Sequence, residues 1–82
     1  MKIEIKNGLS AVNFIKTLRP GDYLEITLSG KEKTEFIKIT NIQGLEFEYF
    51  TIKLDTYGFF EYGPKKTMKY GELVGAKIGL DI

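Results

Sequence analysis

The segment from Glu46 to Asp55 dominates the pattern of the chain, because polar and apolar residues alternate along it but the apolar side changes midway. Side chains of a strand point alternately to its two faces. Up to Tyr49 the aromatic residues occupy one face, and from Phe50 onward the apolar residues occupy the other. A long strand has this pattern when it bends or carries a bulge and serves two sheets in turn. The segment therefore predicts the central strand of a strongly curved β-barrel.

Alternation of apolar and polar residues predicts further strands on both sides of this segment. The clearest is 22–29, in which Leu24, Ile26 and Leu28 share one face. Ile42 breaks the alternation just before the central strand, and Gly63-Pro64 interrupts the region after it. The predicted strands span residues 2–6, 22–29, 34–42, 46–55, 59–62, 67–70 and 76–80, with the last two joined by a turn at 71–75.

One short helix is predicted over residues 11–18, with Ser10 as its N-cap and Pro20-Gly21 as its end. Apolar residues recur at the spacings of three and four that place them on one helical face. These residues are Ala11, Phe14, Ile15 and Leu18. A helix of two turns is unstable alone, so we expect it to pack on the sheet as a plug over an open barrel end. The alternative is a helix that binds a partner.

A short amphipathic helix followed by five bent antiparallel strands, over about residues 10–82, resembles the Sm-like and wider SH3-like small β-barrels. Sm-like proteins read RNA through an aspartate and an asparagine in one strand turn and through a later arginine-glycine or lysine-histidine motif. The corresponding segments here are Asn41-Ile42-Gln43-Gly44 and Lys69-Tyr70-Gly71, and neither motif is complete. The resemblance therefore implies a fold and no binding residue. That fold is mainly β (α+β), a small bent antiparallel barrel or roll with one short N-terminal helix.

A second, shorter resemblance covers the end of the predicted helix. Leu18-Arg19-Pro20-Gly21-Asp22, leading into Tyr23, is similar to the end of the swapped-hairpin, AbrB-like DNA-binding module. The second strand of that module, which comes before its helix, is missing here. The Pro-Gly-Asp sequence is also common at the entry to barrel strands, so the Sm-like interpretation ranks higher.

Composition excludes several functional classes. The 82 residues make a single domain, 1–82, and the absence of cysteine and histidine excludes thiolate and imidazole metal sites and the Ser-His-Asp and Cys-His catalytic pairings. A net charge of +1 is far from that of a non-specific DNA-coating protein. No apolar run suits a signal peptide or a membrane span, so we expect a cytoplasmic protein without a membrane partner. Abundant Lys, Glu and Ile with a single glutamine favours a thermophilic source.

Aromatic residues beside lysines form the one constellation that points to a function. One predicted group lies on the outward face of three neighbouring strands: Tyr23, Phe36, Lys38, Tyr49 and Lys53. A second group is local in sequence: Tyr62, Lys65, Lys66, Lys69 and Tyr70. Rings that stack on bases beside cations that meet phosphates are typical of single-strand binding surfaces. We predict non-catalytic binding of single-stranded RNA or DNA, with no cofactor and no small-molecule substrate.

Two other interpretations stay open. The same aromatic residues can pack against a second subunit, which predicts a protein-interaction or homo-oligomeric assembly module with no nucleic-acid role. An enzyme would have to use carboxylates such as Glu46 and Glu48, whose Cα atoms lie roughly 6.5 to 7 Å apart on one strand face. That separation suits a divalent cation. A solvated strand end explains the two carboxylates more simply, and we predict no enzymatic activity.

Overall fold

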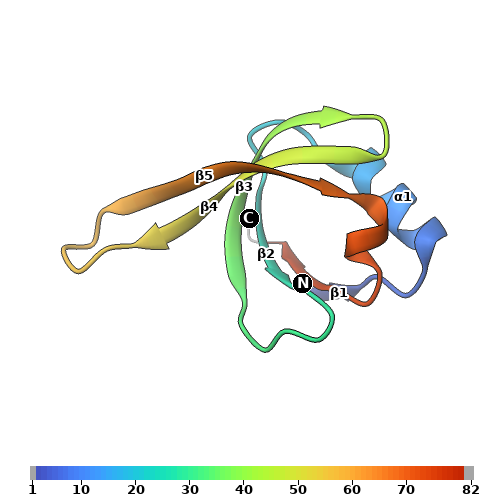
Figure 1. Ribbon diagram of the computed structural model, residues 1–82, viewed down its shortest axis with the longest axis horizontal. Helices are drawn as coiled ribbons and strands as arrows, with labels where there is room; N and C mark the ends of the chain where they lie inside the picture. Colours follow the sequence, from blue (N-terminus) through green and yellow to red (C-terminus); the bar gives the residue numbers. More distant parts are fainter. Residues whose placement is uncertain (1, 81–82) are drawn as a thin grey trace.

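The computed structural model, which describes residues 2–80, contains one antiparallel sheet with a short helix packed on one face (Figure 1). The strands are β1 (Lys2–Glu4), β2 (Tyr23–Thr27), β3 (Glu35–Gln43), β4 (Glu46–Leu54), β5 (Phe60–Lys69) and β6 (Lys77–Leu80). The helices are α1 (Gly8–Thr17) and the 3-10 helix η1 (Tyr70–Leu73). The prediction of a mainly β fold with one short N-terminal helix is confirmed. Residues 1, 81 and 82 of the predicted domain lie outside the described residues.

The face of the sheet that packs on α1, called the inner face here, carries the hydrophobic core. Alternate residues of β2 and β3 reach this face because side chains of a strand alternate in direction. Removing apolar surface from water is the main force that holds so short a helix in place. The buried residues form one cluster: Ile5, Ala11, Phe14, Ile15, Leu18, Leu24, Ile26, Ile37, Ile39, Phe47, Tyr49, Met68, Leu73, Ala76 and Ile78.

The sheet is not closed into a barrel, so this part of the fold prediction is wrong. The strand order β1-β6-β2-β3-β4-β5 leaves β1 and β5 as the two edges, and they do not pair with each other within residues 2–80. After β5 the chain forms η1, which packs against α1, where the sequence predicted only a turn. The N–H of Gly75 then donates to the carbonyl of Ile5 at 2.6 Å. The two helices therefore separate the edges that a barrel would join.

Two bulges bend the sheet where the sequence pattern changes. The pairing of β3 with β4 shifts between Ile39 and Asn41, so that β3 carries one extra residue and Ile42 packs against the core. The pairing of β4 with β5 shifts between Phe50 and Ile52, and here the extra residue lies in β5 near Gly63-Pro64. A bulge accommodates proline, which has no N–H for a ladder. The predicted break between two strands is therefore a bulge within one continuous strand.

Beyond the second bulge, β4 and β5 continue as a two-stranded arm, defined here as residues 52–62, that projects from the body at the left of Figure 1. The arm contributes to a longest dimension of 41 Å, against 26 and 22 Å for the other two. Its turn is closed by the Asp55 carboxylate, which accepts from the N–H groups of Tyr57 and Phe59, both at 2.9 Å. Gly58 has φ +85°, a value that favours glycine.

The second half of β4 does not enter a second sheet, contrary to prediction. Phe50 and Ile52 are half-buried and Leu54 is exposed, and all three lie on the face opposite to α1, called the outer face here. The sequence pattern separates the two faces of β4 correctly. Within residues 2–80, however, the chain supplies no layer that covers the outer face.

Candidate interaction surface

The arm meets the body at a close backbone contact. A Cβ atom added at Gly63 would collide with Oγ1 of Thr51 on the neighbouring strand. Glycine therefore allows β4 and β5 to approach at the bulge, and the bulge increases the local twist of the pair. These features fix the direction in which the arm leaves the sheet.

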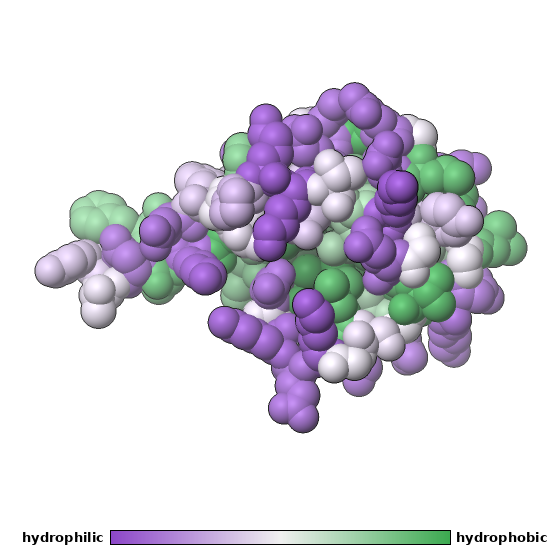
Figure 2. Space-filling model, viewed as in Figure 1, coloured by the Kyte–Doolittle hydropathy of each residue, from purple (hydrophilic) through white to green (hydrophobic). Residues whose placement is uncertain are grey.

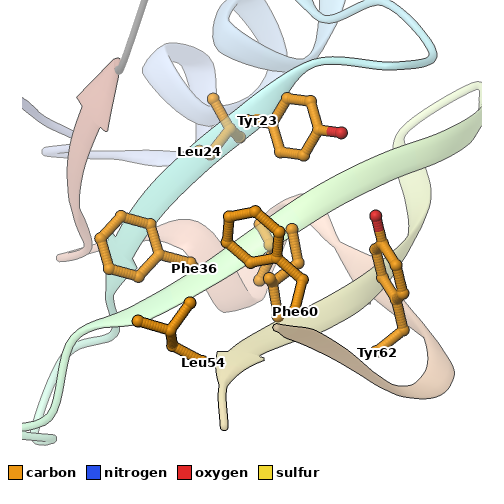
Figure 3. Close-up of a pocket in the computed structure, with 8 residues that line it drawn as sticks. Tyr23, Leu24, Phe36, Leu54, Phe60 and Tyr62 are labelled. Atoms are coloured by element: carbon orange, nitrogen blue, oxygen red, sulfur yellow. The ribbon is translucent and has the colours of Figure 1, made fainter. Parts of the chain in front are cut away.

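At the base of the arm, the outer face is hollowed into an apolar groove with a volume of about 510 Å³. Side chains from β2, β3, β4 and β5 gather around it (Figure 3). None of its lining residues is charged, and only the two tyrosines have polar side chains. The lining residues are Tyr23, Leu24, Phe36, Ile37, Ile52, Leu54, Phe60 and Tyr62.

The apolar surface continues from the groove to the tip of the arm. Leu54 and Phe60, which pair across the arm, are 66% and 70% exposed. At the tip, Tyr57 is 85% exposed and Phe59 is 71% exposed. Figure 2 shows hydrophobic side chains among charged ones along the arm, clear of the body. Leu54 and Phe60 therefore extend the apolar surface of the groove onto the outer face of the arm, whereas Phe59, next to Phe60, points to the opposite face.

The two faces of the arm differ in chemistry. Leu54 pairs with Phe60 and Ile52 pairs with Tyr62, which places these four on the outer face. Lys53 and Glu61, the pair between them, point to the opposite face because side chains alternate along a strand. One face of the arm is consequently apolar and the other charged.

A second, more polar hollow of about 380 Å³ lies on the outer face beside the groove. Its lining residues are Lys38, Thr40, Phe50 and Tyr62. Lys38 Nζ lies 5.4 Å from the centroid of the Tyr23 ring, within the range of a cation–π interaction. The ring of Phe50 meets that of Tyr62 edge-on, with centroids 6.0 Å apart. Cations and rings thus stand side by side at this end of the surface.

Lys65 is the second cation of this region, and a carboxylate already neutralises it. Its Nζ lies 5.4 Å from the Phe50 ring centroid and 3.3 Å from Oε1 of Glu48. The same oxygen accepts a 2.9 Å hydrogen bond from Oγ1 of Thr40. The pair is largely solvent-exposed, so its contribution to stability is small.

The structure brings together five of the ten residues predicted to bind nucleic acid. Their register places them on the outer face, in or next to the two hollows. They are Tyr23, Phe36, Lys38, Tyr62 and Lys65.

The other five lie elsewhere. Tyr49 is only 7% exposed and packs in the core against Phe47, with ring centroids 5.8 Å apart, so it is not part of any surface. Lys66 pairs with Tyr49 and therefore projects to the side opposite to Lys65. Lys53 lies on the charged face of the arm.

Lys69 and Tyr70 are distant from the groove. Seven residues, all of them in β5, separate Tyr62 from Tyr70, which corresponds to at most roughly 27 Å along an extended chain. Tyr70 begins η1, and its ring lies on the α1 side, 3.6 Å from where a Cβ on Gly8 would be. The predicted local cluster around Lys65, Lys66 and Lys69 is therefore not one patch.

Sequence reasoning missed the apolar members of the surface. Phe50, Ile52, Leu54 and Phe60 were assigned to strands of a closed barrel, whereas the structure leaves Phe50 and Ile52 half-buried on the outer face and exposes Leu54 and Phe60 on the arm. A signal was present in the sequence, because apolar residues flank the turn on both sides and Tyr57 and Phe59 lie within it. Hairpin turns are usually polar, so aromatic residues in one indicate a contact outside the chain.

Glu46 and Glu48 of β4 are the carboxylates that the sequence offered to a divalent cation. Among residues 2–80 no three potential metal-ligating side chains of the His, Cys, Asp and Glu types come together. Oε1 of Glu48 is already engaged by Thr40 and Lys65. In the same range, the structure has no helix of the length and apolar character needed to cross a bilayer.

Comparison of the chain with protein-family models, with curated proteins and with solved structures gives no significant match.

Proposed function

We propose that this chain is a non-catalytic protein-interaction module that binds its partner through the groove and the outer face of the arm. The observation that supports this proposal is the size of the exposed apolar surface. Taking roughly 200 Å² for a fully exposed large side chain, the exposed fractions of six residues of the groove, the outer face and the tip amount to roughly 740 Å². The largest apolar patch of a typical monomer is about 300 to 600 Å². The six residues are Tyr23, Phe36, Leu54, Tyr57, Phe60 and Tyr62.

The position of this surface also favours a role in binding. No residue from 50 to 67 belongs to the buried core, so the arm does not stabilise the body by packing. A long apolar hairpin in water invites aggregation, and natural proteins usually cover or charge such elements. A retained apolar arm is therefore best explained by a partner that covers it.

Single-stranded nucleic-acid binding is the second candidate, and a separate observation supports it. Lys38 stands over the Tyr23 ring, and Lys65 stands over the Phe50 ring, which meets Tyr62. Rings beside cations suit bases and phosphates. The protein-interaction proposal ranks first because the larger groove has no charged residue in its lining and Glu48 already neutralises Lys65.

Site-specific photo-crosslinking separates these candidates. A photoreactive phenylalanine replaces Phe60 in one variant and Leu9 on α1 in a control, two positions that are 70% and 71% exposed. Both variants are irradiated alone and in a lysate of the source cells. We expect position 60 to form a protein adduct of defined mass that position 9 does not form. Adding Leu54→Glu to the position-60 variant should abolish this adduct, and adding Leu9→Glu should not.

Other outcomes would contradict the proposal. An adduct only with nucleic acid at position 60 would replace the first candidate by the second. Equal labelling at positions 60 and 9, or no protein adduct at position 60, would overturn the protein-interaction role.

A further inference from the structure

We propose that the partner of this surface is a second copy of the same chain, with the arm of each copy lying over the groove of the other. This inference rests on the proposed function and names its partner. The chain carries both halves of an interface: a groove of about 510 Å³ and, on the arm, the exposed side chains of Leu54, Phe60 and the tip residue Tyr57. Within one chain the tip and the groove cannot meet, because the arm forms one wall of the groove and its tip projects away from the body (Figure 1).

The arm itself requires a further layer packed on its outer face. An isolated two-stranded hairpin is at best marginally stable in water, whereas packing against a further layer stabilises it. In the described structure the outer face of the arm has no such layer, because Leu54 and Phe60 are mostly exposed. A second copy placed on this face would supply the missing layer.

The dimensions of the arm fit a two-fold arrangement. Phe36 pairs with Ile52 at the base of the arm, and the tip residue Tyr57 lies five residues further, in the turn, at most roughly 17 Å away. When the tip of one copy lies over Phe36 of the other, the symmetry axis falls near the middle of this distance. Leu54 and Phe60 occupy that position, so each would face its own counterpart, as an isologous interface requires.

Area and charge agree with such a dimer. If each copy covers its roughly 740 Å² of exposed apolar side chain, the interface buries roughly 1,500 Å² in total, within the usual range for stable complexes. Lys53 and Glu61 stay on the far side of each arm, in water, so the contact buries neither charge. A net charge of +1 per chain adds little repulsion between copies.

Association through the edge of the sheet is a poorer arrangement. β5 is an edge strand, but Pro64 removes one N–H from it and Lys65, Lys66 and Lys69 are exposed along it. Proline and lysine on an edge are the usual means by which proteins prevent strand-to-strand association. The outer face is therefore a better surface for a second copy than the β5 edge.

Sedimentation of the purified chain tests the dimer directly. We expect a mass twice that of the 9.4 kDa chain at micromolar concentration and dissociation on dilution. Leu54→Glu should raise the dissociation constant at least a hundredfold because it places two carboxylates near the symmetry axis. Leu9→Glu is the matched control, since it makes the same change at a similarly exposed leucine on α1, and it should leave the dissociation constant unchanged.

Disulfide trapping tests the arrangement of the two copies. The chain has no native cysteine, so only the introduced cysteines can form a disulfide. Mixing a Tyr57→Cys chain with a Phe36→Cys chain under mild oxidation should give a disulfide-linked heterodimer in high yield. A mixture of Tyr57→Cys with Leu9→Cys should give at least tenfold less.

Two results would overturn the inference. One is a wild-type chain that stays monomeric up to high micromolar concentration, and the other is a dimer that Leu54→Glu leaves intact. A monomeric chain whose position 60 still forms a defined adduct with another protein would reject the second copy as partner and keep the protein-interaction role. Loss of both the dimer and the adduct would reject both proposals.

Discussion

Tyr49 shows at the level of a single residue how burial changes the role of a side chain. It is the one aromatic of the predicted outward group that the structure places in the core, beside Phe47. Burial raises the pKa of its hydroxyl above the usual 10.0, and the carboxylates of Glu35 and Glu72 raise it further. The side chain therefore contributes to stability and its pH dependence, and it does not contribute to binding.

We predict that the stabilising contribution of the Tyr49 hydroxyl is lost at alkaline pH. Because the pKa is higher in the folded than in the unfolded chain, the contribution is fully present below about pH 10 and decreases as the pH rises through the folded pKa. Tyr49→Phe removes this titration. Its free energy of unfolding, measured by urea denaturation, should fall less steeply than that of the wild type above pH 10.

The pH range below 10 provides the control for this measurement. There the Tyr49 contribution is fully present, so Tyr49→Phe and the wild type should have the same slope. Identical slopes for the two chains above pH 10 as well would contradict the account of the Tyr49 environment.

Helix α1 shows what sequence reasoning captured and missed at the level of an element. The apolar spacing predicted a helix over residues 11–18, and α1 spans Gly8–Thr17. Its N-cap is Asn7, not the predicted Ser10, because the Asn7 side-chain oxygen accepts a 2.8 Å hydrogen bond from the N–H of Ser10. Both residue types are good caps. Only the backbone conformation of the loop before α1 decides which of the two residues is the N-cap.

The two caps make different predictions for stability. Asn7→Ala should lower the free energy of unfolding by about 1 kcal/mol, the usual cost of removing an N-cap side chain. Ser10→Ala should change the free energy of unfolding by less than about 0.5 kcal/mol, because the variant keeps the backbone N–H that donates to the Asn7 side chain. Thermal or urea unfolding of both variants measures the difference. A larger loss for Ser10→Ala would favour the cap predicted from the sequence.

Among the strands, the break in alternation at Ile42 correctly marked an irregularity of β3. It coincides with the shift in pairing between Ile39 and Asn41, and the bulge returns Ile42 to the core side. The Gly63-Pro64 signal was interpreted as an end of a strand and is instead a bulge in β5. Glycine and proline mark both features, and only the continued pairing with β4 separates them.

At the level of the whole molecule, the core and the interaction surface are separable. The buried cluster draws on residues up to Tyr49 and from Met68 onward and on none between them. Stability of the body and recognition by the arm therefore depend on different parts of the chain. This separation lets the arm change without loss of the fold.

We predict that the body folds without the arm. Replacing residues 53–61 by Asn-Gly joins Ile52 to Tyr62, which are paired across the hairpin, through a favoured two-residue turn. The free energy of unfolding should stay within about 1 kcal/mol of that of the monomeric Leu54→Glu variant. Ile37→Ala, at a fully buried position, should by comparison cost about 2 to 5 kcal/mol.

Calorimetry or urea unfolding of the three variants provides this comparison, and sedimentation shows whether the shortened chain is monomeric. A shortened chain that fails to fold would mean that the arm supports the body, which would weaken the argument that the arm exists for binding.

The sequence by itself determined the elements and the two faces of each strand. Spacing in the helix and alternation in β2 and β3 depend on side-chain directions that are local to each element. For this reason Phe14, Ile15, Ile26 and Ile37 were recognisable as core residues. The absence of cysteine and histidine also excluded thiolate and imidazole metal sites and the catalytic pairings that use these residues. The resemblance to Sm-like barrels and the binding of single strands stay predictions.

Only the tertiary structure decided which face of each strand is covered and whether the sheet closes. Alternation separates the two faces of β4, but it does not say that Tyr49 points toward α1 and Phe50 away from it. That choice depends on two bulges and on one helix that covers a single face. These are contacts between residues distant in sequence, and they leave the groove and the arm exposed.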